Sequence, residues 1–344
     1  MSNDKCRSCF YFNILHLIFN IRYLLRADNK KITFDLIILI YLVKVMFENT
    51  GIRIIISRYY FFFLLTGLLL SCKQESSGGS QNGFVTTPQE FTVSSSELVE
   101  ASGIADSKTN LGYLWVEQDS GNPPELFLMK HDGAVGKRVH LANVDNRDWE
   151  DMVLSSGPEP GKPYLYIAET GDNLLVHPDY AIYRLEEPAS ATDTVKQIDK
   201  IAFFYPDGSH NAEAMLVDAA TGDIYIITKN DLKSKIFKLA YPYSTTGMNK
   251  AEEIGSLPYD YVVSAAMLPN GKEIVVKTYD AIYYYPYKSG ETILQSLSSQ
   301  LTKLPYQQEP QGEAIAFAAD NSGYFTISEK ALASSVKLYF YKRK

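Results

Sequence analysis

The stretch "WEDMVLSS" (149–156) places a polar residue, Glu150, just before a short run of small and apolar residues. Four other segments repeat this pattern, namely "EASGIADS" (100–107), "NAEAMLVD" (211–218), "VSAAMLPN" (263–270) and "GEAIAFAA" (312–319). Their marker residues, which are spaced by 48, 63, 51 and 49 positions, are Ser102, Glu150, Glu213, Ser264 and Glu313. A period of this length in an all-β pattern predicts a β-propeller with one four-stranded blade for each repeat.

Further strand-like segments follow each marker segment, separated by turns that carry Gly, Asn, Asp and Pro. Second strands are predicted at 113–119, 164–170, 223–229, 273–279 and 323–329. Third strands are predicted at 125–131, 180–186, 235–241, 281–287 and 336–342. Fourth strands are predicted at 136–142, 197–205, 250–257 and about 293–304.

The last repeat stops after three strands, so one blade lacks its outer strand. We expect "QEFTVSS" (89–95), which precedes the first marker, to supply that strand and to remove two open sheet edges. No helical periodicity of useful length follows residue 84. The predicted fold class is therefore all-β, with a single five-bladed β-propeller over residues 85–344.

The N-terminal region predicts export. Arg53 and Arg58 precede "YYFFFLLTGLLLSC" (59–72), an apolar run too short to span a bilayer. This run resembles a bacterial lipoprotein signal with Leu69–Cys72 as the lipobox, and the resemblance implies cleavage before Cys72 and acylation of its thiol. We then expect residues 1–71 to be an over-extended start plus signal peptide, and 72–84 to be the lipid anchor and a flexible linker. The expected location is the bacterial outer membrane, on its periplasmic or surface side.

The charge of the chain is unevenly distributed. Residues 1–71 hold nine Lys and Arg against four Asp and Glu, so a total of −7 leaves about −12 on the remainder. An acidic body argues against nucleic acid as a partner and suits cation binding. The three cysteines are Cys6, Cys9 and Cys72, which provide neither a disulfide framework nor a zinc-site spacing.

Equivalent residues of propeller blades lie at one height around the axis, so the five markers are predicted to converge in the central tunnel. Three carboxylates held together repel one another unless they are protonated or paired. A Ca²⁺ ion, which takes about 6–8 oxygen ligands, removes this conflict, and Ser102, Glu150, Glu213, Ser264 and Glu313 are the predicted metal ligands. The cation is either structural or catalytic. Without a cation, the glutamates would accept backbone hydrogen bonds or face water.

The order of these markers resembles that in the five-bladed calcium-activated nucleotidases, a family of soluble apyrases. That family holds a central calcium with Ser, Glu, Glu, Ser and Glu, one from each blade. "EIVVKTYD" (273–280) also resembles the fourth-blade strand of the family. The segment after the second strand of blade one, which carries an arginine in the family, reads "EQDSGN" (117–122) here. The resemblance implies calcium-dependent hydrolysis of nucleotide phosphates.

A second resemblance is to a group of uncharacterised secreted bacterial propellers that share the pattern "SGIA…DSGN…DWED…GDN…YRLEEP". The pattern is present here at Ser102–Ala105, Asp119–Asn122, Asp148–Asp151, Gly171–Asn173 and Tyr183–Pro188. This resemblance implies export and brings no established reaction.

Loops that follow the second strands are predicted to open on the same face as the loops that enter the innermost strands, and the two sets of loops together form one candidate site. Their acids could position or deprotonate a water, and the predicted catalytic residues are Asp119, Asp148 and Asp172. Their cations and amides could hold an anionic ligand such as phosphate, and the predicted ligand-binding residues are Asn122, Arg147, Asn173, His210, Lys229, Lys277 and Lys330. Each of these residues also has a simple alternative as a turn-forming or solvated loop residue.

Two functions therefore remain open from the sequence. One is a calcium-dependent hydrolase of an anionic, phosphate-bearing substrate. The other is a non-catalytic propeller with a structural calcium that binds an envelope glycan or protein. The chain lacks GxSxG, HExxH, P-loop and GxGxxG motifs, and we expect a monomer attached to the bilayer through acylated Cys72.

Overall fold

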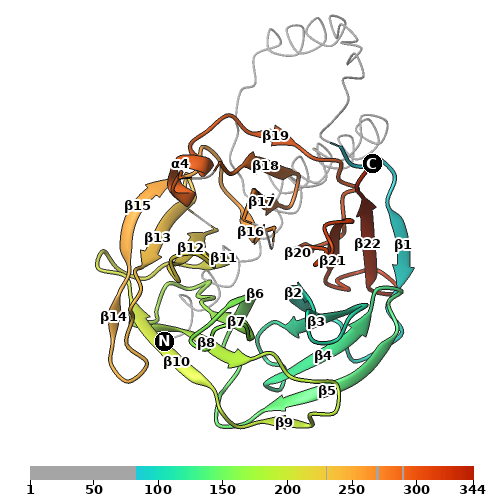
Figure 1. The fold of residues 1–344 in the computed structure, drawn as a ribbon, viewed down its shortest axis with the longest axis horizontal. Helices are drawn as coiled ribbons and strands as arrows, with labels where there is room; N and C mark the ends of the chain where they lie inside the picture. The colour runs from blue at the N-terminus through green and yellow to red at the C-terminus, as the bar shows by residue number, and fades with distance from the viewer. Residues whose placement is uncertain (1–82, 230, 269–270, 289) are drawn as a thin grey trace, which may run out of the picture. The chain divides into compact units, whose positions relative to one another are not determined.

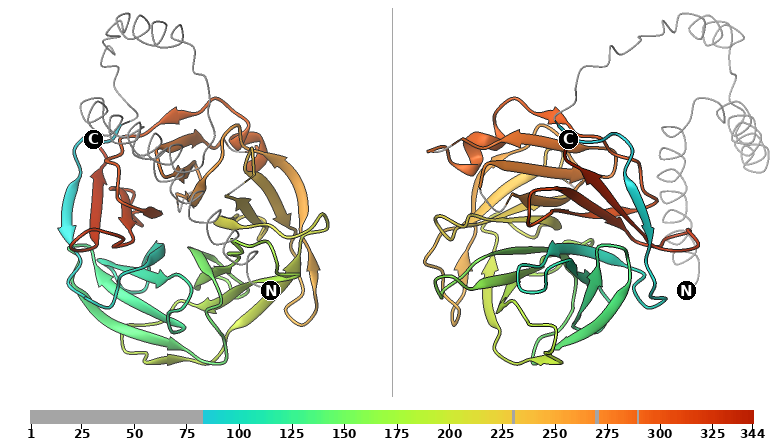
Figure 2. Two further views of the ribbon diagram at one scale, coloured as in Figure 1. Left: turned by 180° about the vertical axis from the view of Figure 1, so that it is seen from behind. Right: turned by 45° about the vertical axis from the view of Figure 1, so that its right-hand side comes forward.

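The computed structural model describes residues 83–344, apart from residues 230, 269, 270 and 289. Five small sheets, each built on four antiparallel strands, follow one another around a common axis, so this part of the chain is a five-bladed β-propeller (Figure 1). Figure 2 shows the same ring from behind and obliquely. The predicted signal peptide, Cys72 and nearly all of the linker lie outside the described residues.

Each blade is built from consecutive strands, as the repeat predicted. The innermost strands are β2 (Ala101–Asp106), β6 (Trp149–Ser156), β11 (Ala212–Val217), β16 (Val262–Met267) and β20 (Gly312–Phe317). The second strands are β3 (Tyr113–Gln118), β7 (Pro163–Glu169), β12 (Ile224–Thr228), β17 (Glu273–Thr278) and β21 (Gly323–Ser328). The third strands are β4 (Glu125–Lys130), β8 (Tyr180–Glu186), β13 (Lys235–Leu239), β18 (Ile282–Pro286) and β22 (Lys337–Lys342). The outer strands are β5 (Val135–Leu141), β10 (Asp199–Phe204), β15 (Glu252–Ser256), β19 (Thr302–Lys303) and β1 (Gln89–Thr92).

The ring is closed by the N-terminal strand. β1 pairs antiparallel with β22, with Gln89 opposite Phe340, so the prediction that 89–95 completes the last blade is confirmed. Two short strands add further joints, because β9 (Thr194–Val195) pairs with β5 and β14 (Asn249–Lys250) pairs with β10. In both cases the chain entering one outer strand first pairs with the outer strand of the preceding blade.

Five hydrophobic clusters hold the blades together, and each lies between two neighbouring blades. Both faces of most inner strands are therefore buried, which is why these segments are nearly continuous apolar runs instead of alternating ones. Trp149 belongs to the cluster between the first two blades.

The fourth blade departs from the prediction of a strand over about 293–304. Residues Ile293–Leu297 form a short helix, α4. Within the predicted fourth strand, only the two residues of β19 pair with β18. Thr292 accepts a hydrogen bond from the backbone N–H of Gln295, and the Gln295 side chain accepts one from Thr292 N–H. This capping box is readable in "TILQ" and outweighs the strand pattern. Among the described residues, no helix is both long and apolar enough to cross a membrane.

A β-bulge at the second residue of each innermost strand sets which side chains reach the axis. The pairing between first and second strands skips one residue in all five blades, and the skipped residues are Ser102, Glu150, Glu213, Val263 and Glu313. The predicted equivalence of Ser264 with the other four markers is therefore wrong. Ser264 lies one position further along, level with Asp151, because blade four places Val263 in the bulge.

Asp151 connects the innermost strands across the axis. One carboxylate oxygen accepts hydrogen bonds from Ser264 Oγ at 3.0 Å and from its neighbour Met152 N, and the other accepts from Met215 N and Ala265 N. These donors lie on β6, β11 and β16. Asp151 is fully buried. The axis is therefore bridged at this level, one residue below the bulges.

Ser264 extends this connection to the last blade, because its Oγ also accepts a hydrogen bond from Ile315 N of β20. We expect Ser264→Ala to lower the free energy of unfolding by about 1–3 kcal/mol, because it leaves buried donors and acceptors unpaired. Urea unfolding of the purified protein measures this. Ser155→Ala is the matched control, since Ser155 is also on an innermost strand and makes one long hydrogen bond of 3.4 Å. Equal losses in the two variants would contradict the proposed role of the axial bridge.

Candidate functional site

The loops from second to third strands and those entering the innermost strands lie at one face of the ring, which we call the mouth face. At its centre Asp119, Asp148 and Glu150 each place a carboxylate oxygen within 4.8 Å of the others. We call these three residues the axial acidic cluster. Asp119 follows β3, and Asp148 and Glu150 flank the start of β6. The first two blades therefore supply the cluster.

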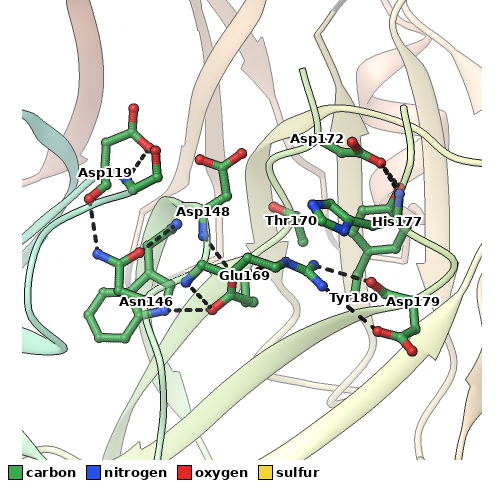
Figure 3. A network of polar contacts seen from close by, with 12 residues as sticks. Asp119, Asn146, Asp148, Glu169, Thr170, Asp172, His177, Asp179 and Tyr180 are labelled. Atoms are coloured by element: carbon green, nitrogen blue, oxygen red, sulfur yellow. Dashed lines mark hydrogen bonds and ion pairs between the residues drawn. The ribbon is translucent and has the colours of Figure 1, made fainter. Parts of the chain in front are cut away.

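Hydrogen bonds hold the segment before β6 and so fix the position of Asp148 (Figure 3). Asn146 donates to the carbonyl oxygens of Gln118 and Asp119, at 2.8 and 3.0 Å. The carboxylate of Glu169, at the end of β7, accepts hydrogen bonds from Asp148 N at 2.7 Å and from the indole of Trp149 at 3.0 Å. These bonds use the backbone of Asp148 and leave its carboxylate facing Asp119.

Gly171 leaves the room that the cluster occupies. A Cβ atom at this position would overlap with the carboxylates of Glu150 and Asp148. Glycine is therefore required here for close approach and not for an unusual backbone angle.

Burial and local charges raise the pKa values of Asp119 and Glu150. Burial, opposed in part by the hydrogen bond from Ser120 N and reinforced by the charge of Asp148, raises the pKa of Asp119 to about 6. Burial and then the charges of Glu213 and Asp119 raise the pKa of Glu150 well above its usual range. Carboxylates in this state are available to a cation that can replace the protons.

The ammonium of Lys229 supplies a positive charge beside the axial acidic cluster. Its ammonium lies 2.5 Å from a carboxylate oxygen of Glu213 and 5.0 Å above the ring of Tyr279. Burial alone would lower the pKa of Lys229, but the negative charges of Glu213, Glu313 and Glu150 outweigh burial and hold it above its usual value. Tyr279 in turn donates to Glu313 at 2.8 Å. Lys229 of the third blade thus balances the charge of Glu213, and Tyr279 of the fourth blade hydrogen-bonds the carboxylate of Glu313 in the fifth.

The five predicted metal ligands are therefore not equally suited to an ion. Ser264 is engaged with Asp151 and Ile315, Glu213 with Lys229, and Glu313 with Tyr279. Glu150 is the member that shares a cluster with other carboxylates.

Two buried side chains of blade one support a site for a ligand near the axis. The hydroxyl of Ser102 has no hydrogen-bond partner among the described residues, and Ser102 is only 2% exposed. Glu117 is fully buried and neither of its carboxylate oxygens has a partner there. Burial and the charges of Asp151, Glu169 and Asp119 raise the pKa of Glu117 well above its usual range. The donor set around Asp119, Asp148 and Glu150 thus fits a hard cation, which prefers oxygen ligands.

Asp172, one of the predicted catalytic acids, instead organises its own loop. Its carboxylate accepts hydrogen bonds from Val176 N, His177 N and the hydroxyl of Tyr180, at 2.8–2.9 Å. Burial by itself would raise the pKa of Asp172, but these bonds outweigh it and hold the pKa below its usual value. A carboxylate that is satisfied in this way does not take a proton readily at neutral pH.

Several predicted ligand-binding residues have internal partners as well. Lys277 is fully buried against Glu309 and the carbonyl oxygen of Gly312, so it is not presented on the mouth face as expected. His210 lies between Asp207 and Asp231, at 3.0 and 3.4 Å.

The other predicted ligand-binding residues are mostly part of the loop framework. Arg147 pairs with Glu169 and Asp179, and Asn122 donates to Glu100. Asn173 accepts from Asn211 at 3.3 Å, while Lys330 is exposed.

Glu329 is a further acid near the site, outside the predicted catalytic, ligand-binding and metal-binding residues. Burial, followed by the charges of Glu313 and Asp119, raises its pKa to about 8. Its place at the end of β21, equivalent to that of Asp119 after β3, is the signal that identifies it.

Comparison with known proteins adds little to this geometry. No family model matches the chain, and no curated protein matches it. Solved structures with partial likeness include a nidogen/laminin complex, with 12% identity over 69% of this chain and 79% of that chain and a TM-score of 0.40. A Dos1 propeller has 11% identity, a TM-score of 0.35 and coverage of 67% and 52%, so the chain spans about half its length. Hydrazine synthase of Kuenenia stuttgartiensis has 9% identity, a TM-score of 0.37 and coverage of 71% and 83%.

The raised pKa values predict a pH-dependent stability in the absence of divalent cations. Asp119, Glu213 and Glu329 hold protons in the folded protein up to about pH 6, 8 and 8, whereas the unfolded chain releases them near pH 4. The folded state then binds more protons, so its stability falls as pH rises from about 4 to about 8. We expect Tm in EGTA to drop by about 3–8 °C between pH 5 and pH 8.

Thermal unfolding followed by circular dichroism checks this slope, and Asp119→Asn should flatten its lower part. A Tm that is constant or rises over this range would show that the carboxylates are already compensated inside the folded protein.

Proposed function

We propose that this protein is a divalent-cation-binding β-propeller of the bacterial cell envelope. The observation that carries the proposal is the convergence of Asp119, Asp148 and Glu150, three carboxylates from two blades, at the centre of the mouth face. Calcium is the ion we expect, because the donors are all oxygens and further positions remain for backbone oxygens, water or a ligand.

The cation would relieve the repulsion that raises the pKa of Asp119 and Glu150. It would also join the loop after β3 to the start of β6, and so stabilise the contact between the first two blades. Ser102, whose hydroxyl lacks a partner among the described residues, is a candidate for a further ligand.

A binding role is better supported than hydrolysis of a strongly anionic substrate. Lys229 and Lys277, two of the three lysines expected to hold such a substrate, pair with Glu213 and Glu309. Asp172, expected to activate water, is satisfied by three donors of its own loop. Most of the charge that faces a ligand at the mouth is therefore negative.

Hydrolysis remains the second candidate because of one pair of residues. Asp119, with its pKa of about 6, faces Asp148. A carboxyl group that titrates near neutral pH next to a bound cation is suited to accept a proton from water. Four of the five marker residues, Ser102, Glu150, Glu213 and Glu313, keep the nucleotidase-like order, which makes nucleoside di- and triphosphates the first substrates to test.

The envelope location belongs to the same proposal. It rests on the lipobox-like segment ending at Cys72 and on the linker that follows it. Acylation of Cys72 would tether the propeller to the outer membrane.

We expect Ca²⁺ to raise the Tm of the purified protein at pH 7.5 and Asp148→Asn to weaken Ca²⁺ binding at least tenfold, because the substitution removes one ligand charge. Isothermal titration calorimetry measures the affinity directly. Asp145→Asn is the matched control, since Asp145 is an exposed acid on the same loop, outside the cluster. Equal affinity of the two variants would place the ion elsewhere.

Phosphate release from nucleoside di- and triphosphates, measured in Ca²⁺ and in EGTA, tests the second candidate. If the protein is a hydrolase, Asp119→Asn should lower kcat by about 100-fold or more, as loss of a general base does. Glu159→Gln, on an exposed turn, is a control that should leave turnover unchanged. No release from a folded, calcium-loaded protein would leave the binding role alone.

A further inference from the structure

Exposed aliphatic side chains gather on the loops of the mouth face. The loop between β7 and β8 carries Leu174, Leu175 and Val176, which are 77%, 54% and 64% exposed. Leu232, between β12 and β13, and Leu332, between β21 and β22, are fully exposed. Three blades therefore present leucine or valine at the tips of equivalent loops. Single exposed leucines are ordinary, but a set placed around one centre indicates a contact surface.

These aliphatic tips surround a centre of negative charge. Six carboxyl groups lie there, three in the axial acidic cluster and three at Glu213, Glu313 and Glu329, and the ammonium of Lys229 pairs with Glu213. The hydroxyl of Ser102, buried at the same level and without a partner among the described residues, is a further acceptor or donor for a group that enters. The complementary surface is apolar around a positive charge.

The chain enters the propeller at the opposite face. β22 runs from the mouth-face loop at its Lys337 end to the far end at Lys342, and Phe84 is bridged there to Arg343. Gly83 accepts a hydrogen bond from Lys344 N. Gly83, the first described residue, thus lies on the side of the propeller away from the mouth face.

We propose that the mouth face docks a protein segment in which a lysine or arginine is flanked by apolar residues. The basic side chain enters among the carboxylates of the axial acidic cluster and Glu329, and the apolar neighbours contact Leu174, Leu232 and Leu332. A separate protein is favoured over an anionic bilayer because the centre of the surface is rich in carboxyl groups. This inference rests on the binding role proposed above and specifies the kind of partner. It depends on the carboxyl groups of the mouth face and does not require bound calcium.

Selection from a random peptide library displayed on phage tests this proposal, because every combination of basic and apolar residues competes for the same surface. Peptides selected on the full-length protein in EGTA should be enriched in Lys or Arg next to Leu, Ile or Phe. Their affinity, measured as synthetic peptides by fluorescence polarisation, should fall about tenfold or more in the double variant Leu232→Asp with Leu332→Asp. Leu111→Asp is the matched control, because Leu111 is 80% exposed but lies between β2 and β3, at the opposite face.

Three results would overturn the proposal. They are selected peptides without basic residues, equal binding by the wild-type protein and the double variant, and Leu-dependent binding of anionic phospholipid vesicles in place of peptides. Addition of Ca²⁺ separates this proposal from the proposed function. If both are right, Ca²⁺ competes with the basic peptide. If no Ca²⁺ site exists, peptide binding is unchanged by the ion and still depends on Leu232 and Leu332.

Discussion

Asp151 is fully buried among the innermost strands, and its hydrogen bonds to β11 and β16 place a carboxyl group in the middle of the fold. Burial raises the pKa of this group to about 8, although four hydrogen bonds oppose the shift. Ser264 relays the contact to β20. Gly103 is small because Glu117 and the Asp151–Met152 backbone fill the space beside it. The register of the inner ring therefore follows from one polar group that must be satisfied.

In the first two blades, many of the polar residues join one blade to the other and are not available to a ligand. The two tryptophans donate to buried glutamates, Trp149 to Glu169 and Trp115 to Glu187, at 3.0 Å in each case. Glu187 also accepts from Thr109 N, so the "EEP" segment ties blade two to blade one. Much of the motif pattern of these blades thus builds the joint between them. What it leaves free at the mouth is the axial acidic cluster.

The charge imbalance at the mouth determines what can bind there. Lys229 balances only part of the surrounding negative charge, and the remaining carboxylates have raised pKa values or face the mouth. A divalent cation and the basic side chain of a partner would both reduce the repulsion among these carboxylates. The cation and the partner are therefore alternative ligands of the same site. Blades three to five contribute Lys229 and the carboxyl groups of Glu213 and Glu313 beside it. The residues that remain available as cation ligands, the axial acidic cluster, come from the first two blades.

The sequence by itself determined the blade count, most strand positions and the closing role of 89–95, because each depends on local periodicity and turn residues that repeat along the chain. It also identified Glu150, Asp119 and Asp148 as residues of one face. Only the tertiary structure decided which oxygens remain available. A bulge moves Val263 into the place expected for Ser264, and packing turns Lys277 and Asp172 toward internal partners. Register and pairing across blades depend on contacts distant in sequence, which no single repeat encodes.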